Sequence, residues 1–397
     1  MTLSGQFILF LLVLLAIAAL LKGDFAFTIL YLIVGAYLFG FLWNLYTVRK
    51  LRIRRTFEPR AFLGENLPVR LQIRNAGFLP VIWLRFRESI PTALATRVKL
   101  DEVISLVPKG RAEVVYNLHA RKRGRYAIGP FYATSNDLLG LTGGFQIEGA
   151  TDYLIVYPAI IPLNNVDLPS RSPLGSLRHT LPIFEDPARV LSKRDYVVGD
   201  SLRRVDWKAT AASGQLQVRQ FEPSIALETV LMLNLNSDEY PTQQRIDATE
   251  LGIVIAASLA NWIVGRRQAV GLTTNGRDPS AAGNDPAAIP SRKGRTHLMR
   301  ILESLACLRL EERMAFADLV RRQSMHLPWG TTLILITGGA DEALFDAIFQ
   351  CQRRGQQVVL ILAGRGVNLQ ESRQRAKYFG IPLYAFATER DLDIWRQ

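Results

Sequence analysis

Residues Thr229 to Leu235 read T-V-L-M-L-N-L, and residues Thr331 to Thr337 read T-T-L-I-L-I-T. Nearly continuous apolar runs of this length are typical of parallel strands that are buried on both faces. Helix-period segments alternate with these runs, which indicates a parallel sheet with helices on both faces. We therefore predict an α/β domain over residues 226–397. Its further strands are expected at 268–273, 357–363 and 383–387, and its helices at 246–264, 296–308, 342–353 and 370–379.

A period of two replaces this pattern over residues 56–160. Apolar and polar residues alternate from Val69 to Arg74 and again from Ile82 to Arg87, with a turn signal at Asn75-Ala76-Gly77 between them. Short alternating strands of this kind predict a small antiparallel domain resembling a β-sandwich. The basic turn from Arg121 to Arg125 is either a solvated hairpin tip or a contact for headgroups or a partner.

The N-terminal region is apolar on every side. Phe7 to Leu21 carries no charge, Lys22-Gly23-Asp24 forms a short polar turn, and Phe25 to Val48 is a second apolar run. Segments of this length and composition suit a bilayer. We predict a transmembrane helical hairpin within residues 1–50, with spans at about 3–21 and 25–48.

A basic block, R-K-L-R-I-R-R, follows the second apolar run directly. The positive-inside bias places such a block in the cytoplasm, so we expect a multi-pass membrane protein with both termini and its other domains cytoplasmic. The block should also attract anionic headgroups, at about 1 kcal/mol per residue. The residues assigned to this membrane surface are Arg49, Lys50, Arg52, Arg54 and Arg55.

Two alternatives to the membrane hairpin remain open. Ala16-Ile17-Ala18 resembles the cleavage site of a secretory signal peptide, although no basic residue precedes the apolar run and a second run follows at once. The two segments could also be buried helices of a soluble domain.

The chain has a net charge of +13, from 48 Lys and Arg against 35 Asp and Glu. Anionic lipid, an acidic protein or nucleic acid could each explain this excess. We expect no nucleic-acid partner, because the sequence has no recognition-helix, RNP-like or zinc-finger signature. The four histidines have no second ligand at helical spacing, which argues against a zinc site.

The segment from Arg194 to Phe221 concentrates acids, bases and aromatic residues within a connecting arm predicted over residues 161–225. It contains the pattern R-D-Y-x-x-G-D-x-x-R-x-x-D-W. Asp200 can cap the turn that follows it and pair with Arg204. Asp206 can hold Arg203 or Arg194. The candidate docking or structural residues are Arg194, Tyr196, Gly199, Asp200, Arg203, Arg204, Asp206, Trp207 and Glu222.

Three interpretations of this motif remain open. It is an internal ion-pair network, a docking surface for a partner, or a catalytic cluster. Catalysis is the least favoured of the three, because no nucleophile stands beside a base.

The motif resembles the bacterial family known as domain of unknown function 58, and the resemblance extends to Arg123-Gly124-Arg125-Tyr126, to Asp137–Leu141 and to the paired N-terminal spans. One departure is Leu138, where that family often has proline. The resemblance implies a protein anchored in the bacterial inner (plasma) membrane, with a von Willebrand factor A-like domain. Such proteins are commonly encoded beside an AAA+ ATPase of the MoxR type, which implies an adaptor or scaffold in envelope maturation.

The turn after the first α/β strand resembles the metal site of von Willebrand factor A-type domains in position but not in composition. Those domains hold Mg²⁺ through D-x-S-x-S and a later aspartate. Here the corresponding residues are Asn234, Asn236 and Asp238, with Gly338 at the later position. Since hard cations prefer charged oxygen ligands, we expect no tight Mg²⁺ binding and no cofactor. Gly364-Arg365-Gly366 lacks the third glycine of a dinucleotide fingerprint, so we expect a tight turn there.

The sequence therefore predicts a non-enzymatic adaptor that is tethered to the membrane and works with an AAA+ ATPase. One alternative is an enzyme of unknown reaction, with a site beyond the carboxyl ends of the sheet that includes Asp200, Asp206 and Asp238. A second alternative is a metal-dependent adhesion module with a degenerate site.

Overall fold

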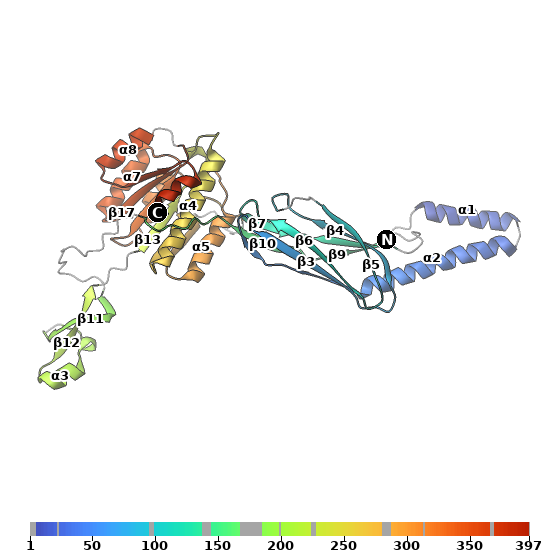
Figure 1. Ribbon diagram of the computed structural model, residues 1–397, viewed down its shortest axis with the longest axis horizontal. Coiled ribbons are helices and arrows are strands. Elements are labelled where there is room, and N and C mark those ends of the chain that lie inside the picture. The colour runs from blue at the N-terminus through green and yellow to red at the C-terminus, as the bar shows by residue number, and fades with distance from the viewer. Residues whose placement is uncertain are drawn as a thin grey trace. The chain divides into compact units, whose positions relative to one another are not determined.

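The computed structural model describes residues 5–21, 24–94, 99–136, 144–166, 185–197, 200–223, 228–279, 287–312, 314–365 and 369–396. The chain divides into two compact units (Figure 1). The first comprises Met1–Ala159 and Leu305–Cys307, and the second comprises Ile160–Ser304 and Leu308–Gln397.

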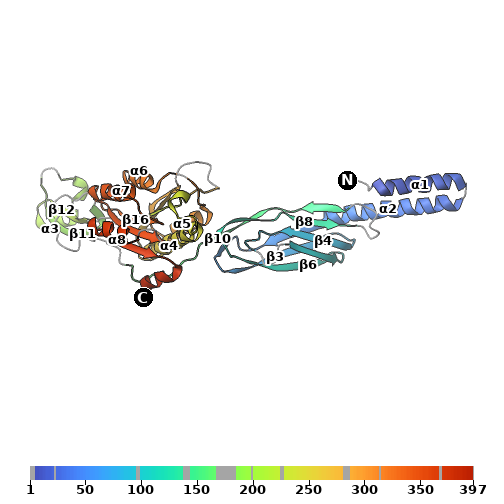
Figure 2. The same cartoon turned by 90° about the horizontal axis from the view of Figure 1, so that it is seen from above.

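The first unit begins with two apolar helices, α1 (Gly5–Leu21) and α2 (Asp24–Lys50), which lie side by side in both views (Figures 1 and 2). Large apolar side chains such as Leu12, Leu32 and Phe39 are exposed along them. Residues 27–50 of α2 are long and apolar enough to cross a membrane. Helix α4 (Arg245–Gly265) meets the same criterion, but it is mostly buried in the second unit as a core helix.

The rest of the first unit is built from short, mostly antiparallel strands. They form three sheets with the orders β1-β3-β6, β2-β10-β7 and β5-β4-β8-β9. Strand β3 illustrates how these sheets bury one face. Its residues are alternately exposed and buried along its whole length, which places one side of the strand against a core. The strand bounds are β1 Leu51–Thr56, β2 Arg60–Phe62, β3 Asn66–Asn75, β4 Val81–Ser89, β5 Lys99–Leu106, β6 Arg111–His119, β7 Gly124–Ile128, β8 Phe131–Ser135, β9 Phe145–Glu148 and β10 Asp152–Tyr157.

A hydrophobic core lies between the sheets of this unit. Leu71 and Ile73 from β3 pack in one cluster with Leu84 and Phe86 from β4 and with Phe131 from β8. The predicted strands at 69–74 and 82–87 are present. The basic block, by contrast, is not wholly a membrane-facing segment, because its last five residues begin strand β1, which pairs with β3.

The second unit contains a six-stranded sheet with the order β15-β14-β13-β16-β17-β18. All neighbours are parallel except β14 and β15, which are antiparallel. The predicted parallel sheet is therefore confirmed. In chain order this is 3-2-1-4-5-6, so the order reverses between β13 and β16. The bounds are β13 Glu228–Leu233, β14 Ala269–Thr274, β15 Ala287–Arg292, β16 Thr332–Thr337, β17 Gln357–Ala363 and β18 Leu383–Phe386.

Helices cover both faces of this sheet. Met232 and Leu335 point into one core with α6 and α7, whereas Leu233 and Ile336 lie beneath Gly252 of α4 on the other face. Helix α6 and the edge strand β15 were not predicted from the sequence. The remaining helices are α5 Arg295–Cys307, α6 Phe316–Ser324, α7 Glu342–Arg353 and α8 Leu369–Tyr378, followed by a short 3₁₀ helix, Glu389–Trp395.

The predicted connecting arm contains more regular structure than expected. Residues 185–189, assigned to an arm with little structure, belong to β11 (Glu185–Asp195), which pairs with β12 (Gln217–Pro223). Residues 167–184 lie outside the described part of the chain. The end of the motif segment, residues 217–221, belongs to β12.

Candidate functional site

The motif segment forms a β-hairpin within the second unit. We call it the hairpin module and define it as residues 185–197 and 200–223. Strands β11 and β12 pair antiparallel, and a 3₁₀ turn (Leu202–Arg204) and helix α3 (Trp207–Ser213) connect them. Val205 and Val218 form a buried bridge at its centre. A core this small cannot stabilise the fold of the module alone. The polar contacts around it are therefore needed for its stability.

Asp200 is held by the strand that precedes it. Both oxygens of its carboxylate accept hydrogen bonds from the guanidinium of Arg194, at 2.7 Å each, and one also accepts from the backbone N–H of Val197. The Arg194 hydrogen bonds, followed by the Val197 bond, lower the pKa of Asp200. The prediction that Asp200 caps the turn after it is wrong. Ser201 occupies the cap position of that turn, and no side chain donates or accepts a capping hydrogen bond there.

Asp206 supports a different part of the module. Its carboxylate accepts from the backbone N–H of Ala209 and so caps helix α3, while its other oxygen lies 3.1 Å from Nζ of Lys193 and 3.8 Å from Nε of Arg219. The Lys193 hydrogen bond is the main cause of its lowered pKa. Of the two partners predicted for Asp206, Arg194 is paired with Asp200 instead, and the side chain of Arg203 lies outside the described residues.

Two large apolar residues of the motif segment remain at the surface. Trp207 is 67% exposed and Leu202 is 65% exposed, although both are large hydrophobic side chains. The backbone N–H of Tyr196 donates to Leu216, which fixes the end of the hairpin. Gly199 lies outside the described residues, as do the side chains of Arg203 and Glu222. The acids are thus used inside the module, and its exposed apolar groups are what a partner would meet.

The lowered pKa of Asp200 and Asp206 predicts acid sensitivity of the module. A carboxylate whose folded pKa is depressed stabilises the fold above its unfolded pKa, about 3.9, and this contribution is lost as the pH falls through the folded value. We expect the β11 and β12 amides to lose protection in hydrogen exchange, corrected for intrinsic rates, between about pH 5 and pH 2. Asp200→Asn should weaken this dependence; an unchanged profile would contradict the assignment.

A second polar cluster lies where β13 and β16 end. The fully buried Asn234 donates from Nδ2 to Glu239 (2.8 Å) and to Thr337 Oγ1 (2.9 Å). Its Oδ1 accepts from the backbone N–H of Asn236 and from the side chain of Asn275. Asn236 also donates to Glu239, at 3.1 Å. This closed network satisfies the buried polar groups at the point where the strand order reverses.

Tyr240 fills the space beside this network. Its hydroxyl donates to the backbone oxygen of Asn234 at 2.6 Å, and a Cβ at Gly338 would stand 2.3 Å from its ring. Glycine at position 338 is therefore a packing requirement. Of the residues predicted as metal candidates, Asn234 and Asn236 are buried in the network, while Asp238 is exposed. No group of three or more His, Cys, Asp or Glu suited to a metal occurs within the described ranges.

Replacing Asn234 with aspartate should destabilise the second unit. The Asn234→Asp carboxylate would face Glu239 at hydrogen-bond distance without the amide donor, which we expect to cost about 2–4 kcal/mol. Because like charges raise the pKa of a carboxyl, this loss should grow from pH 5 toward about pH 8. Hydrogen exchange of β13 and β16 measures it. The exposed Asp238→Asn should change stability by less than about 0.5 kcal/mol, and an equal effect of both variants would refute the network's role.

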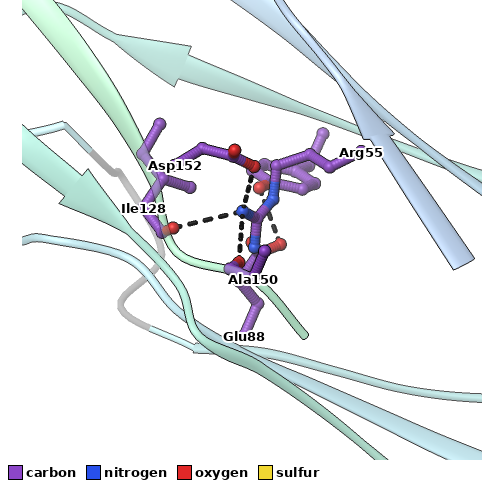
Figure 3. Close-up of polar contacts among 6 residues, drawn as sticks. Arg55, Glu88, Ile128, Ala150 and Asp152 are labelled. Atoms are coloured by element: carbon purple, nitrogen blue, oxygen red, sulfur yellow. Dashed lines mark hydrogen bonds and ion pairs between the residues drawn. The ribbon is translucent and has the colours of Figure 1, made fainter. Parts of the chain in front are cut away.

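Arg55 corrects the predicted membrane surface. Its side chain is 2% exposed and lies inside the first unit, where it pairs with the fully buried Glu88 and with Asp152 at 2.7 Å (Figure 3). It also donates to the backbone oxygens of Ile128 and Ala150. The other four basic residues of the block are exposed: Arg49, Lys50, Arg52 and Arg54.

Glu88 completes this buried cluster. One carboxylate oxygen contacts Arg55, and the other accepts from the hydroxyl of Tyr116 at 2.7 Å. Burial raises the pKa of Glu88, whereas the Tyr116 hydrogen bond and the charge of Arg55 oppose that rise. The cluster joins β1, β4, β6 and β10, so Arg55 has a structural role in the fold.

Two further predicted turns lie at the ends of strands. Gly364 has a positive φ of 98°, and a Cβ there would meet Ala248 at 2.7 Å, which explains the glycine without a dinucleotide. Gly366 lies outside the described residues. In the basic turn, Arg121 and Lys122 are exposed, and the guanidinium of Arg125 stacks over the ring of Tyr153 at 4.4 Å.

Comparison with known sequences gives one match that includes both the hairpin module and the turn after β13. Residues 192–325 match the family model described as Protein of unknown function DUF58. The chain is also 23% identical over 298 residues to the uncharacterized protein YeaD of Bacillus subtilis (strain 168), covering 72% of this chain and 70% of that protein. These matches support the resemblance of this chain to the DUF58 family. The matched segment contains every motif residue from Arg194 to Glu222 and the network around Asn234 except Thr337.

Solved structures resemble only parts of the chain. The CARDB domain of a Pyrococcus furiosus protein is 16% identical, with a TM-score of 0.20, and covers 27% of this chain and 86% of its own. Proximal thread matrix protein 1 from the mussel byssus is 14% identical, with a TM-score of 0.32, and covers 43% of this chain and 46% of its own. Neither similarity is close enough to argue from.

Proposed function

We propose that this chain is a membrane-anchored, non-enzymatic adaptor whose hairpin module recruits a partner protein. One observation carries the proposal: the acids of the motif are bound within the module, while Trp207 and Leu202 remain exposed. Exposed large hydrophobic side chains, tryptophan above all, are typical of interaction sites. A catalytic use of Asp200 or Asp206 would have to break the contacts that hold the module together.

The two apolar helices support membrane attachment. Leu12, Leu32 and Phe39 are exposed on helices with no polar face, which favours an apolar solvent around them. The exposed cations Arg49 and Lys50 at the end of α2 favour the cytoplasmic side. In the proposal α1 and α2 cross the inner membrane, and the strands of the first unit and the whole second unit lie in the cytoplasm.

The second unit is proposed to be a von Willebrand factor A-like domain. Its 3-2-1-4-5-6 strand order and the polar turn at the reversal point support this likeness. In place of charged metal ligands, the turn has the amides of Asn234 and Asn236 around Glu239. We propose that the domain acts as a rigid support for recruitment rather than as a metal-dependent adhesion module.

The proposed partner is an AAA+ ATPase of the MoxR type, acting in maturation or assembly of envelope proteins. The support is the DUF58 match together with the motif that carries it. Capture of the tagged full-length protein from native membranes, under conditions that trap the ATPase with bound nucleotide, tests the proposal. We expect an AAA+ ATPase among the recovered proteins, and its absence across repeated captures would overturn the assignment.

A further inference from the structure

A loop of the first unit, residues 76–80 between β3 and β4, lies beside the last turns of α2. Nε1 of Trp43 donates a hydrogen bond to the backbone oxygen of Pro80 at 3.1 Å. The backbone N–H of Ala76 donates to the backbone oxygen of Lys50 at 3.0 Å. The loop therefore follows α2 over about 10 Å, along the end of the segment that is long and apolar enough to cross a membrane.

The fully buried Asn75 joins this loop to a second loop, residues 107–110 between β5 and β6. Its Nδ2 donates to the backbone oxygen of Leu79 at 2.8 Å and to that of Val107 at 3.2 Å. Its Oδ1 accepts from the backbone N–H of Gly77 at 2.9 Å. One side chain thus uses its donor group and its acceptor to fix both loops at the same end of the unit.

Each loop presents a large apolar side chain that the described part of the first unit leaves exposed. Phe78 is 71% exposed and Val107 is 69% exposed. Nζ of Lys109 lies 4.8 Å from the centre of the Phe78 ring. This end of the unit therefore combines apolar groups with a cation, as segments that lie in a membrane interface do. Because the loops are already fixed, little ordering would oppose their binding to a surface.

A row of three arginines crosses the sheet β1-β3-β6 directly behind the loops, and we call it the arginine row. Arg52 lies opposite Arg74 in the pairing of β1 with β3, and Arg74 lies opposite Arg111 in the pairing of β3 with β6. All three are exposed, and none forms an ion pair with an acid in the described part of the chain. Since like charges directly opposite one another on neighbouring strands repel, an anion beside the row would stabilise it.

We infer that the two loops and the arginine row dock the first unit on an anionic phospholipid surface, an inference that rests on the proposed membrane attachment. Phe78 and Val107 enter the headgroup region beside α2, and the arginine row binds lipid phosphates behind them. The exposed Arg49 and Lys50 at the end of α2 add to the same positive surface. A lipid surface is favoured over an acidic protein because the loops are held against the helix that, in the proposal, enters the bilayer.

Quenching of a fluorescent probe on the second loop tests the docking. The full-length protein carries a labelled Val107→Cys, with Cys307 and Cys351 replaced by serine, in nanodiscs of phosphatidylcholine and phosphatidylglycerol. Phosphatidylcholine with a nitroxide near the start of its acyl chain should quench this probe at least about threefold more than the same probe at Val115→Cys. Val115 is 54% exposed and lies further along β6. Equal quenching at the two positions would overturn the inference.

Two double variants locate the contribution of charge. Arg74→Gln/Arg111→Gln removes two cations of the arginine row, and Arg121→Gln/Lys122→Gln removes two exposed cations from the turn beyond the opposite end of β6. The first should lower the quenching at position 107 by about half or more, whereas the second should leave it unchanged, because attraction to a charged surface falls off within a Debye length. Loss of repelling charges is not expected to unfold β3 and β6. Equal effects of the two double variants would contradict lipid binding by the arginine row.

Alkaline extraction separates the docking from the membrane attachment. We expect the full-length protein to stay in the extracted membranes and its probe at position 107 to be quenched. Retention without quenching would overturn the docking and leave the attachment standing. Release of the protein would overturn the membrane attachment, and the docking with it.

Discussion

Replacing Arg55 with alanine is expected to lower the free energy of unfolding of the first unit by about 3–5 kcal/mol. The change leaves Glu88 buried without its cation and removes hydrogen bonds to Ile128, Ala150 and Asp152 at once. Hydrogen exchange of the amides of β1, β4 and β10 measures the effect in the full-length protein.

Two comparisons make this prediction specific. Arg54→Ala, one residue earlier on the exposed face of β1, should change the free energy by less than about 0.5 kcal/mol. The double variant Arg55→Met/Glu88→Met replaces the ion pair with apolar side chains and should recover much of the loss. Equal effects of Arg55→Ala and Arg54→Ala would show that the buried cluster does not hold the unit together.

Replacing Trp207 with alanine is expected to reduce recovery of the proposed partner ATPase at least about tenfold without unfolding the chain. Tryptophan at the centre of an interface commonly contributes 2 kcal/mol or more to binding, about a thirtyfold change in affinity. Trp207 is the first residue of α3 and contributes no side-chain hydrogen bond to the cap, which Asp206 supplies. Quantitative capture from native membranes measures the loss.

The control for this experiment is a tryptophan elsewhere on the surface. Trp329 of the second unit is 59% exposed, so Trp329→Ala removes a similar area outside the hairpin module. We expect capture to be nearly unchanged in that variant. Asp200→Ala is expected to disturb the β11–β12 pairing, so a folded Asp200→Ala protein that loses its partner would instead make the acid part of the docking surface.

Periodicity predicted most of the fold. The runs at 229–235 and 331–337 match buried parallel strands, and the alternation at 69–74 matches β3, because in these segments burial follows directly from the position along the strand. Strand β15 was missed because it is an edge strand in which exposed and half-buried residues alternate. Helix α6 was missed because it is short and lies in a segment rich in charged residues.

Arg55 shows why a charge block can mislead. Leu51, Ile53 and Arg55 face inward from β1, whereas Arg52 and Arg54 face outward. The alternation is visible in L-R-I-R-R, but the density of arginine favoured a membrane surface over a strand. The partner of Arg55, Glu88, lies 33 residues away, and no local pattern could have paired them.

The candidate sites were predictable in position more than in detail. The sequence identified the motif residues and the turn at Asn234, since acids beside bases and polar residues after a buried strand are both visible locally. Their partners were not. Lys193 and Arg219 face Asp206 through the β11–β12 pairing, and Glu239, which organises the Asn234 network, was not among the predicted residues.

The most direct test of the account is the side of the membrane on which the C-terminus lies. A cysteine added after Gln397, in a variant in which Cys307 and Cys351 are replaced by serine, can be labelled in intact cells with a thiol reagent that does not cross the inner membrane. We expect no labelling until the membrane is permeabilised, as required for recruitment of a cytoplasmic ATPase. Efficient labelling in intact cells would contradict the proposed adaptor.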